Sequence, residues 1–479
     1  MVYEPNKNNK ENIMNTKECV TVWSVLICAA ACHDARAANI SAVNRFKDED
    51  RLNVYLRAVH IDTQAKNNLI ENRLGGLPAG GHFGGTAVGA IVDYNSKYYA
   101  DVIGFDASLY GVAPIESQDS SQELLDDRHG HNEGFFKVGQ SYLKVRHLDE
   151  TWSADMQLGR GRFDAGTIES LDTRVVPETY QGARSHLTFT DVGIGPLPGK
   201  LVLESAFIDQ ASPRDRGEFI HLRSEGKAPI DNVYTYGINY NLKALEFGYV
   251  RGVAKDYNEN TGYTFIARMP LGKQYAAILD VSHYRFKRAG AVWDQDWRSG
   301  HAAYDDHASW TNLNVGFRAG KLLAGISYAK ANAKLSNGKL GYAYFYHGAD
   351  VSGASNVWTR SGNDFNNDGE HAWQLAAEYD LAGLSLFGVP LEGFKAAALF
   401  KRGTFDAQNP FDQRVANVKE RQNEYRLYYR FDEEHRSGLS VGIIYTDYHI
   451  NEDFVAVISA QPDNVLTGKE LRTYIDYAF

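Results

Sequence analysis

Cysteine, proline and long hydrophobic runs are scarce in this chain. Of its 479 residues, three are cysteine and 12 are proline, and the mean hydropathy is −0.41. So few cysteines exclude a disulfide scaffold, and the lack of heptads and of a glycine period excludes a coiled coil and a collagen-like chain. The low mean hydropathy argues against a bundle of membrane-spanning helices. It does not argue against a membrane β-barrel, whose apolar residues alternate with polar ones.

A basic surface is also missing. The chain has 50 Lys and Arg against 60 Asp and Glu, a formal net charge of −10, and no basic stripe, so nucleic-acid binding is not expected. Aromatic residues make up 12% of the chain, which excludes intrinsic disorder. A soluble chain of this length would have two or more domains. The 29 Tyr and 44 Gly instead favour a β-barrel.

All three cysteines lie in the first 32 residues, within a segment that has the features of a secretory signal. A polar lead ends at Met14, which is an alternative start codon. Lys17 then precedes an apolar run over 20–31, which is long enough for the core of a signal and too short to cross a bilayer. Ala35-Arg36-Ala37 supplies the pattern of small residues at a cleavage site.

We therefore expect a cleaved signal peptide over residues 1–37, followed by a single barrel domain over 38–479. A buried N-terminal helix is the alternative interpretation of the apolar run. A lipoprotein signal ending at Cys32 is a second alternative, although 29–31 lacks the leucine that such a site usually carries.

From Arg51 onward, runs of about ten residues alternate between apolar and polar side chains, as in a strand with two different faces. In 311–318 the two sets are Leu313, Val315 and Phe317 against Asn312, Asn314, Gly316 and Arg318. The same pattern occurs in 52–57, 233–242 and 424–431. A soluble β-sandwich gives this alternation too, with its apolar face inward. Aromatics at the strand ends and bulky charges on the polar faces favour lipid outside and water inside.

The connections between these runs fall into two classes. Some are tight, as at 93–97, 241–244 and 319–321. Others are long and polar, and they cover roughly 111–134, 160–184, 209–231, 286–309, 331–370, 403–422 and 449–469. This asymmetry is typical of an outer-membrane barrel with short periplasmic turns and long extracellular loops. The length predicts a transmembrane antiparallel barrel of about 16 to 20 strands, wide enough for an aqueous channel.

The C-terminal nonapeptide, Leu471 to Phe479, ends on an aromatic residue. Leu471, Ile475, Tyr477 and Phe479 share one face of this expected strand. The segment resembles the terminal strand that the barrel-insertion machinery of Gram-negative bacteria recognises. An ordinary edge strand is the alternative, but it would not require a final aromatic residue.

Several stretches resemble the OprD family of substrate-specific outer-membrane porins, in the family's order along the chain. They are Leu52–Arg57 in the first strand, Tyr142–Arg146 and Met156–Gly159 before the constriction loop, Ser170–Gly182 in that loop, Asn363–Trp373 in a late loop, and Tyr379–Leu381 with Gly388–Leu391 after it. This resemblance implies an 18-stranded barrel narrowed by inward-folded loops, which passes small water-soluble nutrients such as carboxylates and amino acids. It also implies a ladder of Arg and Lys along one lumen wall, with Arg57, Arg146 and Arg174 at ladder or constriction positions.

The late part of the chain departs from the family pattern. Leu399 stands where an arginine is common, and Leu439–Tyr445 lacks the expected arginines. The ladder is therefore thinned, which argues against a strongly anionic substrate. We expect weak or no anion selectivity.

The candidate substrate-pathway residues each have two interpretations. Arg174, beside Asp172 and Tyr180, offers a guanidinium fork for a carboxylate, or it anchors the loop to the barrel wall. Arg57 and Arg146 are guide charges or solvated lumen residues.

Arg426 and Arg430, on one strand with Glu424, either replace missing ladder charges or form a lattice of ion pairs in the lumen. The lattice is the favoured interpretation.

No metal or cofactor is expected. His129 and His131 lie in a charged loop and favour solvated side chains over a metal site. The segment from Asp364 to Gly369 resembles the start of a calcium loop, but Leu375 occupies the position of the bidentate glutamate, which excludes an EF-hand. The sequence contains neither a nucleophile elbow nor a helix motif with two histidines, so we do not expect an enzyme.

The sequence thus predicts a passive outer-membrane porin for small solutes. A non-conducting barrel that acts as an adhesin or surface enzyme is the alternative. The expected partners are small-molecule solutes, outer-membrane lipid and lipopolysaccharide, and the insertion machinery through Phe479. The expected oligomeric state is a monomer or a loose trimer.

Overall fold

The computed structural model describes residues 49–65, 82–117, 123–126, 132–195, 197–336, 339–353, 364–408, 414–431, 438–450 and 468–478. The predicted signal peptide, His129 and His131, and Phe479 lie outside these residues. Among the helices that are described, none is long and apolar enough to cross a membrane.

Twenty-one strands are described, and setting aside three two-residue strands, β8 (Ile220–His221), β16 (Ser385–Leu386) and β17 (Val389–Pro390), leaves eighteen. The eighteen are β1 (Arg51–Ala65), β2 (His82–Asn95), β3 (Ile103–Ser117), β4 (Phe135–Leu148), β5 (Trp152–Gly161), β6 (Thr179–Phe189), β7 (Gly199–Ser212), β9 (Val233–Leu242), β10 (Leu245–Ala254), β11 (Asn258–Pro270), β12 (Tyr275–Arg288), β13 (His307–Ala319), β14 (Leu322–Asn332), β15 (His371–Asp380), β18 (Phe394–Gln408), β19 (Arg414–Arg430), β20 (Ser440–Ile450) and β21 (Gly468–Ala478).

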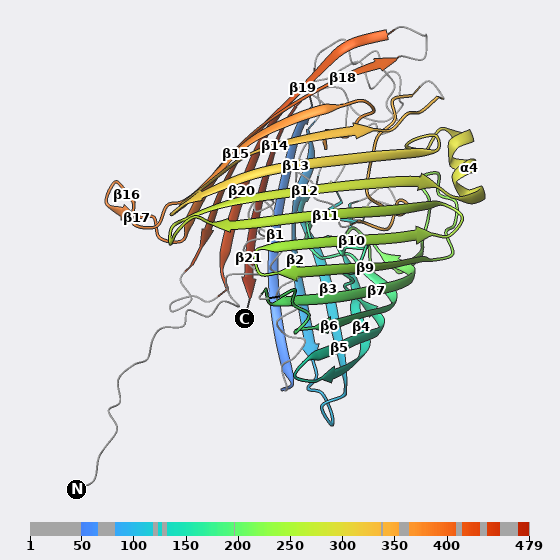
Figure 1. Cartoon of the computed structure of the whole chain (residues 1–479), viewed down its shortest axis with the longest axis vertical. Coiled ribbons are helices and arrows are strands. Elements are labelled where there is room, and N and C mark those ends of the chain that lie inside the picture. The colour runs from blue at the N-terminus through green and yellow to red at the C-terminus, as the bar shows by residue number, and fades with distance from the viewer. Residues whose placement is uncertain are drawn as a thin grey trace.

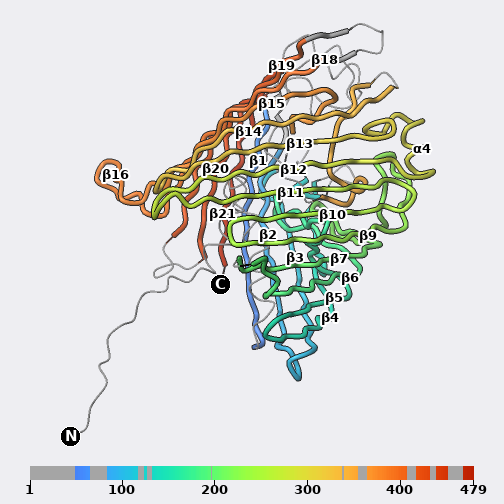
Figure 2. Tube along the Cα trace, viewed as in Figure 1, coloured from blue at the N-terminus to red at the C-terminus, as the bar shows by residue number. Residues whose placement is uncertain are grey.

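These eighteen strands form one closed antiparallel barrel. Each pairs with its neighbour in the chain, and β1 pairs with β21, so that Arg57 lies opposite Asp476. Figures 1 and 2 show β1 and β21, the first and last strands, side by side. Closure leaves no unpaired strand edge, which a sheet surrounded by lipid requires. The predicted transmembrane barrel is therefore confirmed, with a strand number inside the expected range.

The barrel is apolar outside and polar inside. On β13, Leu313, Val315 and Phe317 are 39%, 46% and 43% exposed, whereas Asn312 and Asn314 are buried. A soluble sandwich would show the opposite arrangement. The two faces are those that the alternation predicts, and the outward face is the one that contacts lipid.

The two ends of the barrel differ (Figure 1). At the turn end, connections are short, as between Ala319 and Leu322, and the β16–β17 hairpin projects. At the loop end lie the longer connections and the helix α4 (Gly290–Ser299), which the sequence did not predict. Gly300, at a φ of 76°, ends this helix. The predicted loop over 403–422 is wrong at both ends, because β18 continues to Gln408 and β19 begins at Arg414.

Loop side chains pack inside the loop end of the barrel in two apolar clusters. One joins Tyr180 on β6 to Trp293 of α4 and Phe345 of the segment 339–353. The other packs Val175 and Val176 against β1, β2 and β3. These clusters hold the loops inside the lumen rather than above it.

Candidate functional site

The connection between β5 and β6, residues 162–178, crosses the lumen and is called the constriction loop below. On one side, the backbone nitrogen of Thr167 donates a hydrogen bond to Thr235 of β9 at 2.7 Å. On the other side, Val175 and Val176 are buried against Val59 of β1 and its neighbours. The loop therefore joins two walls that are far apart around the barrel, and it narrows the path between them.

Arg57 anchors the constriction loop to β1. Its Nη1 lies 2.5 Å from Oδ1 of Asp172 and donates to the carbonyl oxygen of Arg174 at 3.0 Å. Its Nε lies 2.6 Å from Oδ1 of Asp476 on β21. The Arg57 side chain is 16% exposed, so both ion pairs are largely shielded from water. In the sequence analysis, anchoring was one of two interpretations of Arg174; in the structure, Arg57 makes these anchoring contacts.

Arg174 lies at the edge of the same loop, in a group with Arg214, which follows β7, and Arg472 of β21. Oε2 of Glu123 lies 3.5 Å from Nη2 of Arg174 and 2.7 Å from Nη2 of Arg214. Burial lowers the pKa of Arg174 to about 10, and the nearby charges of Arg214 and Arg472 act in the same direction. With a pKa of about 10, Arg174 stays protonated at neutral pH, and its guanidinium suits the carboxylate of a solute. Arg472 is paired with Glu470 on its own strand.

Tyr180 does not join this group. Its side chain is fully buried, its hydroxyl donates to the carbonyl oxygen of Glu169 at 3.3 Å, and it accepts from the backbone nitrogen of Ser352 at 3.1 Å. Tyr180 thus connects the constriction loop to the segment 339–353. The structure does not bring Arg174, Asp172 and Tyr180 together as one binding fork, because Asp172 is held by Arg57.

A buried histidine makes a second connection between these two loops. Nε2 of His347 lies 2.8 Å from Oγ1 of Thr167, and its Nδ1 lies 2.8 Å from Oδ1 of Asn258. Burial lowers the pKa of His347 to about 3, so the ring is neutral at physiological pH. A neutral imidazole fits a structural hydrogen-bond role rather than a charged one.

Arg146 lies at the turn end, away from the constriction loop. Its Nη2 is 3.2 Å from Oδ1 of Asp101, and its guanidinium carbon is 4.0 Å from the centre of the Tyr98 ring. These contacts hold the connection between β2 and β3. Arg146 is therefore neither at the constriction nor a solvated lumen residue.

Arg426 belongs to a buried lattice of ion pairs. It pairs with Glu424, which also accepts from Nζ of Lys401 at 2.9 Å, and all three side chains are fully shielded. Arg426 thus lies in a lattice of ion pairs, and a place for it in the solute pathway stays a prediction. Arg430 lies at the turn end of β19 and is exposed, and its backbone nitrogen donates to the carbonyl oxygen of Gly393 at 3.0 Å.

Further basic residues of the lumen were missed by sequence reasoning. On β4, Lys144 lies 2.6 Å from Asp106, and Nζ of Lys137 donates to Ser212 at 2.9 Å. On β6, Nε of Arg184 donates to Gln157 at 2.6 Å. Their position on the polar face of an alternating strand was a usable signal for all three.

The calcium-like segment holds a neighbouring loop. Nδ2 of Asn366 donates to the carbonyl oxygen of Ala343 at 2.8 Å, and Oδ1 of Asp368 accepts from the backbone nitrogen of Ala333 at 2.6 Å. Within the described part of the chain, no three His, Cys, Asp or Glu side chains are grouped so as to hold a metal ion.

A closed barrel with an apolar exterior, a polar interior and a loop folded across its lumen defines the class of outer-membrane channel-forming proteins. The chain belongs to the OprD family of outer membrane porins, whose family model matches residues 44–478. It is therefore a protein of the bacterial outer membrane.

Solved structures of this family have the same fold. Acinetobacter baumannii OccAB3 superimposes with a TM-score of 0.70 at 18% identity, covering 90% of this chain and 99% of its own. Pseudomonas aeruginosa OccK9 (OpdG) superimposes with a TM-score of 0.68 at 17% sequence identity. Pseudomonas aeruginosa OpdK with vanillate superimposes with a TM-score of 0.68 at 15% sequence identity. Both cover 91% of this chain and 99% of their own. No protein with a curated description matches the sequence.

Proposed function

We propose that this porin is a passive channel for small water-soluble nutrients and that the constriction loop forms its narrowest point. The observation that carries the proposal is the span of that loop, from Thr167 bonded to β9 to Asp172 bonded to Arg57 on β1. A loop held on both sides by buried contacts keeps a fixed aperture. Such an aperture selects solutes by size and shape.

The solutes that we propose are carboxylates, amino acids and similar small molecules. Arg174 and Arg214, which share the carboxylate of Glu123, supply guanidinium donors for a carboxylate. The solved OpdK structure, which is similar in fold, is described with vanillate. Glu123 partly offsets the positive charge, and the chain as a whole carries −10. We therefore expect both anionic and cationic solutes to pass, with weak or no preference for anions.

The proposed orientation places the turn end in the periplasm and the loop end outside the cell, in contact with lipopolysaccharide. Short turns and long loops are distributed in this way in bacterial outer-membrane barrels. The C-terminal strand, β21, would be the strand recognised by the insertion machinery.

Liposome swelling tests the proposal. Vesicles containing the folded barrel are placed in isosmotic solutions of a carboxylate, an amino acid and a series of sugars of increasing size. We expect rapid swelling with the carboxylate and the amino acid, and slower swelling as the sugars grow. Vesicles that swell no faster than protein-free ones in every solute would identify a barrel that its loops have closed, and would contradict the proposal.

A further inference from the structure

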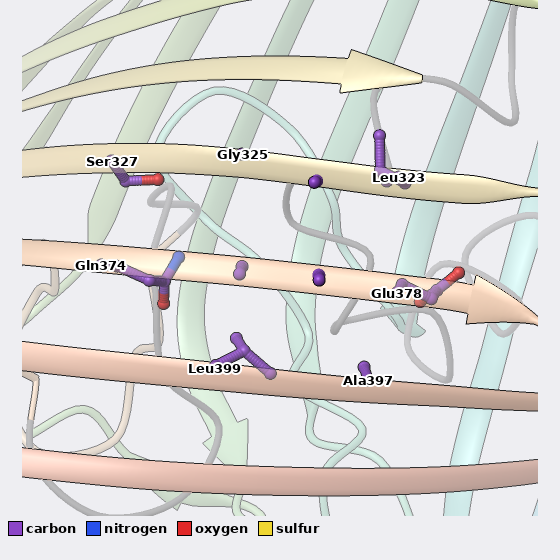
Figure 3. Close-up of a pocket in the computed structure, with 10 residues that line it drawn as sticks. Leu323, Gly325, Ser327, Gln374, Glu378, Ala397 and Leu399 are labelled. Carbon is purple, nitrogen blue, oxygen red and sulfur yellow. The ribbon is translucent and has the colours of Figure 1, made fainter. Parts of the chain in front are cut away.

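The lumen wall formed by β14, β15 and β18 contains an open groove, lined mainly by glycine, alanine and leucine, with Gln374 and Glu378 among its polar residues. The groove begins at Leu323, directly after the β13–β14 turn, and so lies toward the turn end of the barrel. Figure 3 shows Ser327 and Gln374 at one end of the groove and Leu323 and Glu378 at the other.

Neighbouring small side chains make the hollow. Gly325 lies opposite Ala376, and Ala376 lies opposite Leu399, so one row across three strands carries no long polar side chain. On the β13 side, the row continues with Gly316 opposite Gly325. Residues opposite each other in a sheet share the space above it, so adjacent small residues leave that space open.

Gln374 is the polar group at one end of the groove. Its side chain is 3% exposed, and it makes no hydrogen bond to any residue in the described part of the chain, with its Oε1 fully buried. The side-chain amide of Gln374 makes no hydrogen bond that fixes its orientation. Either its oxygen or its nitrogen can therefore face the groove. A buried amide without a partner is unusual in a folded protein. It points to a ligand with a hydroxyl or amide group.

Glu378 supplies a carboxylate at the other end. Lys395 and Arg426 act on it electrostatically, but neither forms an ion pair with it in the residues that the structure describes. Arg426 is already paired with Glu424. Arg318 lies two strands away, on β13, and its Nε donates to the carbonyl oxygen of Gly320 at 3.1 Å. Glu378 is therefore the charged group of the groove that remains available to a solute.

We propose that this groove binds small solutes that carry an ammonium group and an apolar body, with the ammonium at Glu378 and a hydroxyl or amide at Gln374. The two residues are four positions apart on one strand, about 13 Å, which matches a solute with a chain of about six carbons. The inference rests on the proposed function, because it gives a passing solute a second site after the constriction. It names amine-bearing solutes as a substrate class.

Binding is tested on the full chain folded in detergent, by ligand-observed NMR, with 6-amino-1-hexanol as the probe and 6-hydroxyhexanoate as its carboxylate counterpart. We expect the amine to bind and the carboxylate to bind about tenfold more weakly, the scale of discrimination that a mismatched pocket gives. Ala376→Leu fills the hollow and should weaken binding of the amine by a similar factor. Glu378→Gln should remove the preference for the amine.

The matched control is Ala398→Leu, which makes the same change on the lipid-facing side of β18 and should leave binding as in the wild type. Equal binding of the amine and the carboxylate, or unchanged binding in Ala376→Leu, would overturn the inference. Because this readout requires no conduction, it stays separate from the proposed function. A barrel that binds the amine and does not conduct would contradict only the channel.

Discussion

Two walls of the same lumen differ in how their side chains are used. The wall of β1, β4, β6 and β21 carries long basic side chains, each bonded to a neighbour, such as Arg57 with Asp172 and Lys144 with Asp106. The wall of β14, β15 and β18 presents Gly325, Ala376 and Leu399 and forms a groove. The first wall holds the constriction loop, whereas the second leaves space for a solute.

The difference shows that a charge in the lumen does not by itself mark a solute site. Arg57, Arg146 and Arg426 are all committed to protein carboxylates. A charged side chain in such an ion pair holds its protein partner in place, and it attracts a passing ion only weakly because its charge is neutralised. Attraction depends instead on charges that are less fully neutralised. These are Arg174 and Arg214, which share the single carboxylate of Glu123, and Glu378, which has no ion-pair partner in the described part of the chain.

Removal of the anchor should have the largest effect. Arg57→Ala leaves the carboxylates of Asp172 and Asp476 without their guanidinium partner, a change that costs about 3–5 kcal/mol when a buried pair is broken. We expect the constriction loop to leave the wall and the single-channel conductance to rise several-fold. Arg146→Ala, a change of the same kind at the turn end, is the control and should leave the conductance unchanged. Equal conductance of Arg57→Ala and the wild type would show that the loop is held by other contacts.

The pH dependence of loop docking should be the next largest effect. Burial raises the pKa of Glu178 from 4.5 to about 7, and Arg214 opposes this shift. Because the folded state favours the neutral acid, the stabilisation is complete below pH 4.5 and is lost as the pH rises through about 7. The change is on the order of 3 kcal/mol. Hydrogen exchange of residues 162–178 should therefore be slower at pH 5 than at pH 8, after correction for intrinsic exchange rates.

Glu178→Gln is the control for that experiment, because an amide at this position does not titrate. The corrected exchange rates of the variant should be the same at both pH values. A variant that retains the wild-type pH dependence would assign the effect to another group, with Lys137 of β4 as the nearby basic candidate.

A smaller effect is expected at the arginine group. Arg174→Ala removes one positive charge. In water, the attraction between such a charge and an anion 4 Å away is about 1 kcal/mol, so the local occupancy by anions should fall about fivefold. We expect a wider aperture, a modest rise in conductance and a shift of the reversal potential toward cations in a salt gradient. Arg174→Lys keeps the charge and should retain most of the wild-type reversal potential. An unchanged channel in Arg174→Ala would mean that this part of the loop does not face the solute path.

The smallest expected effect tests the other wall. Leu399→Arg places a guanidinium in the groove beside Glu424, its cross-strand neighbour. We expect a slight shift of the reversal potential toward anions, because part of the added charge is neutralised by Glu424. A shift as large as that of Arg174→Ala, with opposite sign, would show that the two walls control selectivity equally.

The barrel was predictable because alternation is a local property. The alternation within one strand shows which residues share each face. Leu313 could therefore be assigned to the outer face and Asn314 to the inner face without knowledge of the rest of the chain. The limits of the loop at 403–422 were not predictable in the same way. The residues of that region are polar, and polar residues also occur in strands that extend beyond the membrane.

The site was less predictable because its contacts are far apart in sequence. Arg57 and Asp172 are separated by 115 positions, and Arg57 and Asp476 by 419. Sequence reasoning could identify the residue types and the loop, but not which arginine would anchor it. The groove depended on the register of three strands, which sets Gly325, Ala376 and Leu399 in one row.

Single-channel recording in planar bilayers tests the central claim most directly, namely that the lumen conducts past a loop fixed by Arg57. The folded wild-type barrel should give discrete and uniform conductance steps, and Arg57→Ala should give larger and less uniform ones. Folded wild-type protein that inserts without producing any steps would contradict the account.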